Sequence, residues 1–118
     1  MNAPVTPRAV REAGATRAED LVSLDLIRAV LDIKEAAARL NHRLGCLDNS
    51  ACTAICGAVE RFRQATDAEL RPWFCLDALQ GGAGTAINMN ANEAICALAA
   101  LESPGTALHP LRHVNLHT

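Results

Sequence analysis

Residues 80–93 read QGGAGTAINMNANE, a glycine-rich segment that runs directly into an apolar helical pattern. Its three glycines allow backbone geometries that a Cβ would forbid. Thr85 and three asparagines, the first of them Asn88, then line the entrance of a helix that we predict over about 88–101. Hydroxyls and backbone N–H groups at a helix start can receive an anion, so one interpretation is a carboxylate pocket. The alternative is a glycine turn with asparagine caps, which composition alone favours.

A long helix is predicted on the N-terminal side of this segment. Residues 16–44 contain no glycine or proline, and their first four have the Thr-x-x-Glu form of a capping box. We therefore expect a helix over about 18–43, with Gly45 in the C′ position that suits glycine. Apolar side chains recur along it at alternating spacings of 4 and 3, which predicts one buried stripe. The stripe consists of Leu26, Val30, Ile33, Ala37, Leu40 and Leu44.

A second helix is expected over about 50–65, because Asp48 and its polar neighbours offer N-terminal caps. Gly57 lies in its interior, where glycine costs about 1 kcal/mol relative to alanine but can permit close helix approach. A short helical turn is expected at 67–70, and Pro72 bars regular helix beyond it. With a third helix and no convincing pair of strands, the predicted fold class is all-α, mainly helical with long loops.

The composition excludes several classes of function. The 118 residues carry a net charge of −2 with a pI of about 6.0, so no basic excess supports nucleic-acid binding. No cluster of Lys and Arg indicates a membrane surface, and no apolar run reaches the roughly 18 residues of a membrane helix. Five cysteines without an N-terminal apolar signal segment predict a reducing, cytoplasmic location.

The segment at 80–93 resembles the N-terminal signature of the aspartase/fumarase superfamily, whose members eliminate ammonia or water from dicarboxylic acids. A second block, HPLRHVN at residues 109–115, resembles the next motif of that family at about the expected distance. The resemblance implies the helical N-terminal domain of that fold without its central helical bundle. Residues 16–118 would form this domain, truncated before the bundle, and residues 1–15 a flexible tail.

The resemblance implies a role in substrate binding for four residues. In the family, a hydroxyl at the position of Thr85 helps to bind a carboxylate of the small dicarboxylate substrate. Asn88 and Asn115 are further candidates, although either could instead hold the loop backbone together. His113 is expected in a loop near the substrate pocket, and hydrogen bonding within that loop is an equally open interpretation.

The same resemblance limits what this sequence can do alone. Leu111 and Arg112 replace the Asn-Asp pair typical of fumarases, which favours an aspartase-like activity. Elimination needs a base for the β-proton and donors for the charge that builds on the adjacent carboxylate. The family's base serine and central bundle are absent from this sequence, so we assign no catalytic residue and predict an inactive isolated chain. Apolar faces of the first and third helices should then be exposed, which predicts self-association or pairing with a complementary lyase fragment.

Two other interpretations stay open. The chain could be a non-catalytic helical interaction module that retained a lyase-like glycine-rich turn. Cys52 and Cys56 lie one helical turn apart, with His42 and Cys46 upstream, and a zinc site could use such residues. Their spacing fits no standard zinc finger, and buried cysteines are common in alanine-rich cores, so we expect neither a metal nor a cofactor.

Overall fold

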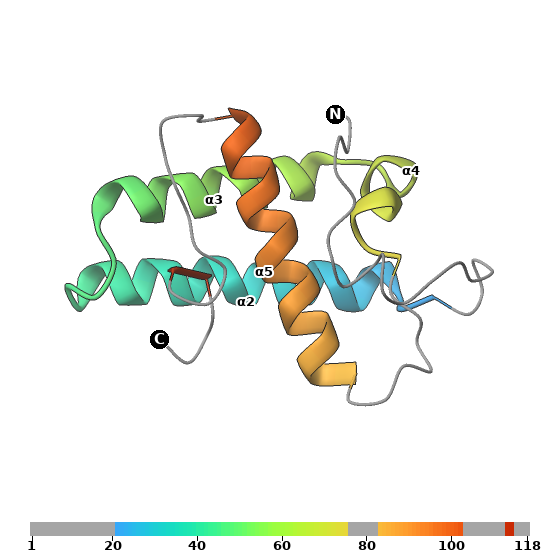
Figure 1. The fold of residues 1–118 in the computed structure, drawn as a ribbon, viewed down its shortest axis with the longest axis horizontal. Helices are drawn as coiled ribbons and strands as arrows, with labels where there is room; N and C mark the ends of the chain where they lie inside the picture. The colour runs from blue at the N-terminus through green and yellow to red at the C-terminus, as the bar shows by residue number, and fades with distance from the viewer. Residues whose placement is uncertain (1–20, 76–82, 103–112, 115–118) are drawn as a thin grey trace.

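The computed structural model of the chain describes residues 21–75, 83–102 and 113–114 (Figure 1). The main helical segments are α2 (Leu24–Arg43), α3 (Asn49–Gln64), α4 (Asp67–Leu70), the 3₁₀ helix η2 (Arg71–Trp73) and α5 (Ala83–Glu102). No β-strand runs through these ranges, which confirms the all-α prediction. The predicted tail over 1–15 and the predicted capping box at 16–19 lie outside the described residues.

Three long helices make up the body of the fold. Figure 1 shows α2 and α3 side by side, with α5 crossing both of them. The short segments α4 and η2 follow α3 at one end of the pair. Each of the three long helices packs against the other two, so the core lies between them.

The first helix begins later than its sequence indicated. Ser23 caps it, because its Oγ accepts a hydrogen bond of 3.1 Å from the backbone N–H of Asp25. Residues 21–23 are not helical, so the predicted start near 18 is wrong and a local serine cap defines the helix start instead. The C-terminal end is as predicted, since Gly45 follows the helix with a φ of +80° that favours glycine.

Local capping also sets the ends of the next two helices. The side chain of Asp48 accepts a bond of 2.7 Å from the N–H of Ala51, and α3 then runs close to the predicted 50–65. Thr66 and Glu69 form a reciprocal capping box around α4, which confirms the short turn predicted at 67–70.

The third helix begins five residues before the predicted start at 88. Ala83 is its first residue, so residues 83–87, which we expected to precede the helix, are helical. Small residues cause no steric conflict in a first helical turn, and Gly84 costs only about 1 kcal/mol there. The glycine-rich segment therefore enters the helix instead of ending before it.

The buried face of α2 is not the predicted stripe. Ile27, Leu31, Lys34 and Ala38 face the core. Four members of the predicted stripe are exposed instead: Leu26 at 47%, Ile33 at 52%, Leu40 at 47% and Leu44 at 66%. Apolar side chains lie on two sides of this helix. The alternating spacings of 4 and 3 that we used to predict the buried side occur on the side that faces outward. The expectation that the first helix exposes an apolar face is confirmed.

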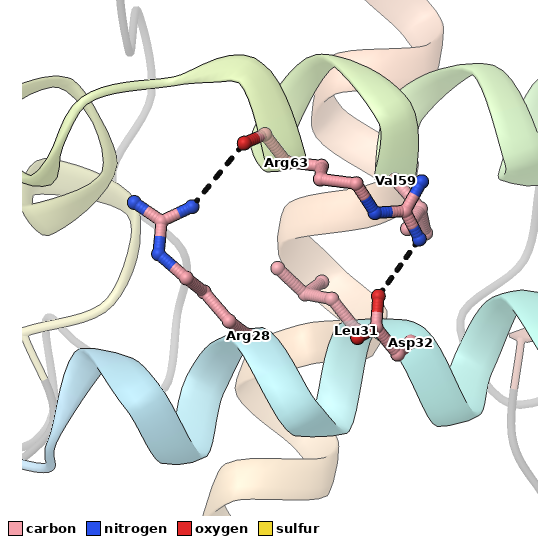
Figure 2. A pocket seen from close by; sticks show the side chains of 5 residues that line it. All are labelled: Arg28, Leu31, Asp32, Val59 and Arg63. Atoms are coloured by element: carbon pink, nitrogen blue, oxygen red, sulfur yellow. Dashed lines mark hydrogen bonds and ion pairs between the residues drawn. The ribbon is translucent and has the colours of Figure 1, made fainter.

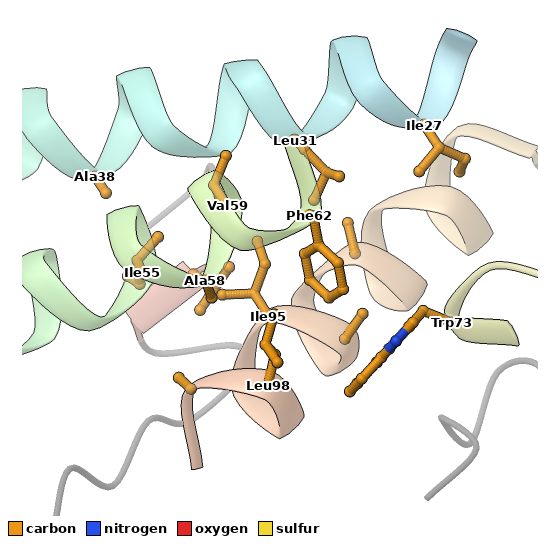
Figure 3. Packing of buried hydrophobic residues seen from close by; sticks show 14 of the residues in the cluster. Ile27, Leu31, Ala38, Ile55, Ala58, Val59, Phe62, Trp73, Ile95 and Leu98 are labelled. Carbon is orange, nitrogen blue, oxygen red and sulfur yellow. The ribbon is translucent and has the colours of Figure 1, made fainter. Parts of the chain in front are cut away.

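The aromatic residues pack together within the core, where Figure 3 shows Phe62 and Trp73 among the buried apolar side chains. The ring of Phe62 lies edge-on to the rings of Trp73 and Phe74, with centroids 5.2 and 5.5 Å apart. All three side chains are fully buried, as are Ala91 and Ala94 of α5. Buried small residues on α5 allow it to pack closely against α3.

Candidate functional site

A buried lysine joins the segments that carry the two sequence blocks. Lys34 is the one lysine of the chain, and it lies on the core-facing side of α2 with 1% of its surface exposed. Its ammonium donates a hydrogen bond to the side-chain oxygen of Asn88 on α5. It also lies 3.4 Å from the backbone carbonyl of Val114, to which it donates a second bond. α2, α5 and residues 113–114 therefore meet at one cation.

The environment of Lys34 explains its charge state. Burial disfavours the ammonium and lowers the pKa of Lys34 from 10.5 to about 8. The two oxygen acceptors favour the protonated form, because hydrogen bonds from a charged ammonium are stronger than those from a neutral amine. With a pKa of about 8, the group is still mostly charged near neutral pH. A cation of this kind can hold oxygen-bearing segments in place or contribute positive potential to a neighbouring anion site.

The predicted site residues have different outcomes. Asn88 is half-buried and bonded to Lys34, and His113 is half-buried next to Val114, so these two lie on segments that Lys34 connects. Thr85 lies in the first turn of α5, with its side chain outside the described part of the structure. Asn115 lies outside the described residues altogether. The proposed roles of these residues in substrate binding stay predictions.

The start of α5 has the electrostatic character that an anion requires. The first N–H groups of an α-helix have no partner within the helix, and its dipole places positive potential at this end. The first turn of α5 contains no acidic side chain that would cancel this potential. Thr85 is in this turn, and the pocket interpretation requires its hydroxyl at the start of a helix.

Two asparagines of the motif serve the core rather than an open pocket. Asn90 is fully buried and donates from Nδ2 to the carbonyl of Trp73 at 3.0 Å, so it fixes α5 against η2. Asn92 is also fully buried, and neither of its amide atoms has a hydrogen-bond partner among the described residues. Of the three asparagines that follow Thr85, Asn90 and Asn92 are therefore enclosed in the core, and Asn88 alone is partly exposed.

A separate hollow between α2 and α3 is a partly exposed ion-pair site (Figure 2). It encloses about 210 Å³ and is lined by Arg28, Leu31, Asp32, Val59 and Arg63. Arg63 donates to Asp32 at 2.7 Å and also pairs with Glu35 and Glu60, so three carboxylates surround it. Arg28 donates to main-chain carbonyls at the end of α3 and to Asp67. Both guanidinium groups are already neutralised, which makes this hollow a poor anion site.

The cysteines offer no metal centre in the described residues. No group of three or more His, Cys, Asp or Glu side chains comes together there. Cys52 is buried with its Sγ 3.7 Å from the carbonyl of Ala38, and burial raises the pKa of Cys56 to about 11. A thiol that stays protonated is a poor ligand and a poor nucleophile. None of the helices described is long and apolar enough to cross a membrane.

Comparisons with curated proteins give matches to two kinds of enzyme. The chain is 38% identical over 103 residues to a fumarate hydratase class II of Chlamydia caviae, which covers 83% of this chain and 22% of that protein. It is 40% identical over 95 residues to an aspartate ammonia-lyase of Helicobacter pylori, covering 75% of this chain and 19% of that enzyme. A fumarate hydratase class II of Xylella fastidiosa is 43% identical over 91 residues, which make up 76% of this chain and 18% of that protein. The chain thus spans about a fifth of the length of the curated relatives it matches. No family model matches it, and no solved structure does.

Proposed function

Because the chain belongs to the aspartase/fumarase superfamily and resembles its N-terminal domain, we propose that it forms one wall of a dicarboxylate site. The reaction at that site would be elimination of ammonia or water from a dicarboxylic acid to give fumarate. We propose an aspartase-like rather than fumarase-like reaction, since Leu111 and Arg112 replace the Asn-Asp pair of fumarases. The helical part of the chain, residues 16–118, would supply this wall without the catalytic bundle.

The bond network of Lys34 is the observation that carries the proposal. The two blocks that resemble lyase motifs are separated in sequence, yet Lys34 contacts Asn88 in one and Val114 in the other. A site assembled from both blocks needs such a connection, because neither block alone offers enough donors for a dicarboxylate. The connection also puts a buried positive charge close to the proposed site.

Each proposed residue has a role in binding that suits its chemistry. The hydroxyl of Thr85 and the backbone N–H groups at the start of α5 would bind one carboxylate through charge-assisted hydrogen bonds. Asn88 and Asn115 would donate amide hydrogens to the substrate or orient its carboxylate, and the imidazole of His113 would add a further donor. These donors stabilise the charge that grows on the carboxylate when the β-proton leaves. The base that takes this proton would come from another polypeptide or segment.

The isolated chain should therefore bind a dicarboxylate without converting it. Purified protein would be assayed for fumarate formation from aspartate, malate and argininosuccinate, with an intact aspartase as the positive control. We expect no turnover above the uncatalysed rate. Fumarate production by the chain alone would overturn this part of the proposal.

Binding would be measured by NMR titration with succinate, a dicarboxylate that cannot be eliminated. Thr85→Val and Asn88→Ala should each weaken binding roughly tenfold or more, because each removes a hydrogen bond to a charged group. Thr53→Val is the matched control, since Thr53 is exposed on α3. Wild-type protein without succinate-dependent shifts, or equal effects of all three substitutions, would refute the site.

The alternative function is a non-catalytic helical interaction module. The exposed leucines of α2 favour it, because a large exposed apolar face usually marks an interface. Sequencing the coding DNA downstream of codon 118 would distinguish the lyase fragment from the interaction module. A lyase-like continuation, or a neighbouring reading frame encoding the bundle, supports a split or truncated lyase, and the absence of both favours the module.

A further inference from the structure

The outward face of α2 carries a helix-pairing pattern of which only Val30 packs against the core. Leu26, Ile33 and Leu40 recur every seven residues, and each is followed four residues later by Val30, Ala37 or Leu44. We call these six residues the outer stripe. Four of them are exposed, and Val30 and Ala37 are half-buried. Alternating spacings of 4 and 3 over 18 residues are what two helices in lengthwise contact require.

We propose that the outer stripe pairs with the outer stripe of a second copy of this chain, in antiparallel orientation. In the antiparallel register that matches all six positions, Leu26 faces the partner's Leu44 and Val30 faces the partner's Leu40. Ile33 faces the partner's Ala37, so a large side chain meets a small one near the two-fold axis. Such a pairing is closed, because each copy uses the same surface and no free stripe remains to recruit a third.

The charges beside the outer stripe favour a second copy in this orientation. Asp25 and Arg43 lie eighteen residues apart, which is five turns at about 3.6 residues per turn, so they project from the same flank of α2. Both are exposed, and neither side chain forms an ion pair among the described residues. In an antiparallel pair, Asp25 of each copy lies near the partner's Arg43. In a parallel pair, like charges would meet at both ends.

Two further features allow close approach along this face. Ala29 and Ala36 lie on α2 beside the outer stripe and are exposed, so their methyl groups leave room for a neighbouring backbone. The remaining charged residues of α2 are engaged within the chain: Arg39 pairs with Glu35, and Asp32 with Arg63. The outer stripe therefore meets no unpaired charge except the two that the antiparallel register pairs.

Sedimentation velocity on the full chain tests the proposal. From about 5 to about 300 μM, the mass should rise from 12.5 kDa toward twice that value. Ile33→Glu should raise the dissociation constant about a hundredfold, because it places two carboxylates near the two-fold axis. Thr53→Glu is the matched control, as it adds the same charge at an exposed position of α3. Circular dichroism would verify that both variants keep the wild-type helicity.

A charge-exchange cycle tests the orientation. Asp25→Arg and Arg43→Asp should each raise the dissociation constant roughly fivefold, and the double variant should return it to near the wild-type value. A monomer at every concentration, or equal effects of Ile33→Glu and Thr53→Glu, would overturn self-pairing through the outer stripe. The outer stripe would then pack against something other than a second copy, such as a segment that the longer relatives have in addition to the matched region. Equal affinity in all four members of the cycle would overturn the antiparallel register.

Discussion

Replacing Lys34 with methionine tests whether the buried cation behaves as its surroundings indicate. Methionine keeps an unbranched side chain of similar length, so the change removes the charge without opening a large cavity. It also leaves the carbonyl of Val114 and the side-chain oxygen of Asn88 without the donor that Lys34 supplies. We expect the variant to lose a specific pH dependence of stability and to loosen residues 113–114.

The size of this pH dependence of stability follows from the pKa of Lys34, which burial lowers from 10.5 to about 8. Between these values the unfolded state binds more protons than the folded state, so the free energy of unfolding of the wild type rises with pH. From about pH 7 to about pH 9 this contribution should be about 1 kcal/mol. Below about pH 7 both states are protonated, and the contribution is constant. The variant has no lysine, so it should lack this rise.

Urea unfolding followed by circular dichroism would measure the difference between the two proteins at each pH. Burial raises the pKa of Cys56 to about 11 and that of Cys96 to about 12, which lowers stability at alkaline pH. Both proteins contain these thiols, so their effect cancels in the difference. Arg39→Met, which removes an exposed cation from the same helix, serves as the control. An equal rise in stability for wild type and Lys34→Met would refute the reasoning, as would unchanged hydrogen exchange at Val114.

Other predictions concern the helices themselves. Gly57→Ala should stabilise the fold by about 1 kcal/mol, because a Cβ added at this exposed position meets nothing within 4 Å. Urea unfolding would measure the change, and a loss of stability would show that a Cβ at this position meets a steric conflict. Asp48→Ala should destabilise by about 1 kcal/mol, since it removes the acceptor for the N–H of Ala51, and Asp48→Asn should recover most of that loss. Equal effects of the two Asp48 substitutions would contradict the capping role.

Helix ends that depend on one local interaction could be predicted from sequence. Asp48 identified the start of α3, and Gly45 the end of α2, because a side-chain cap and a positive φ are local requirements. The start of α5 could not be predicted in this way. Its glycines suggested an irregular backbone, but Gly84 lies within the helix. The suggested role of Gly57 in close helix approach was also wrong, because that position is open to solvent.

The buried face of α2 and the candidate site were harder to predict. Apolar side chains on two sides of α2 make both faces plausible, and only tertiary contacts select the one with Leu31. Asn88 was named from the motif, but its partner Lys34 was missed, because a lysine on a helix is usually solvated. One signal was present: Lys34 is three residues from Leu31 and four from Ala38, and it is the one lysine in the chain. The roles of Thr85 and Asn115 remain predictions.

The aromatic cluster gives the protein a built-in optical reporter. Trp73 is the one tryptophan, there is no tyrosine, and the indole is fully buried beside the ring of Phe62. Its emission should be blue-shifted in the native protein, because the ring is shielded from water. Since Asn90 binds the carbonyl of the same residue, any event that lifts α5 from its neighbours would change that emission. Undocking of the glycine-rich helix could thus be followed in real time without an added label.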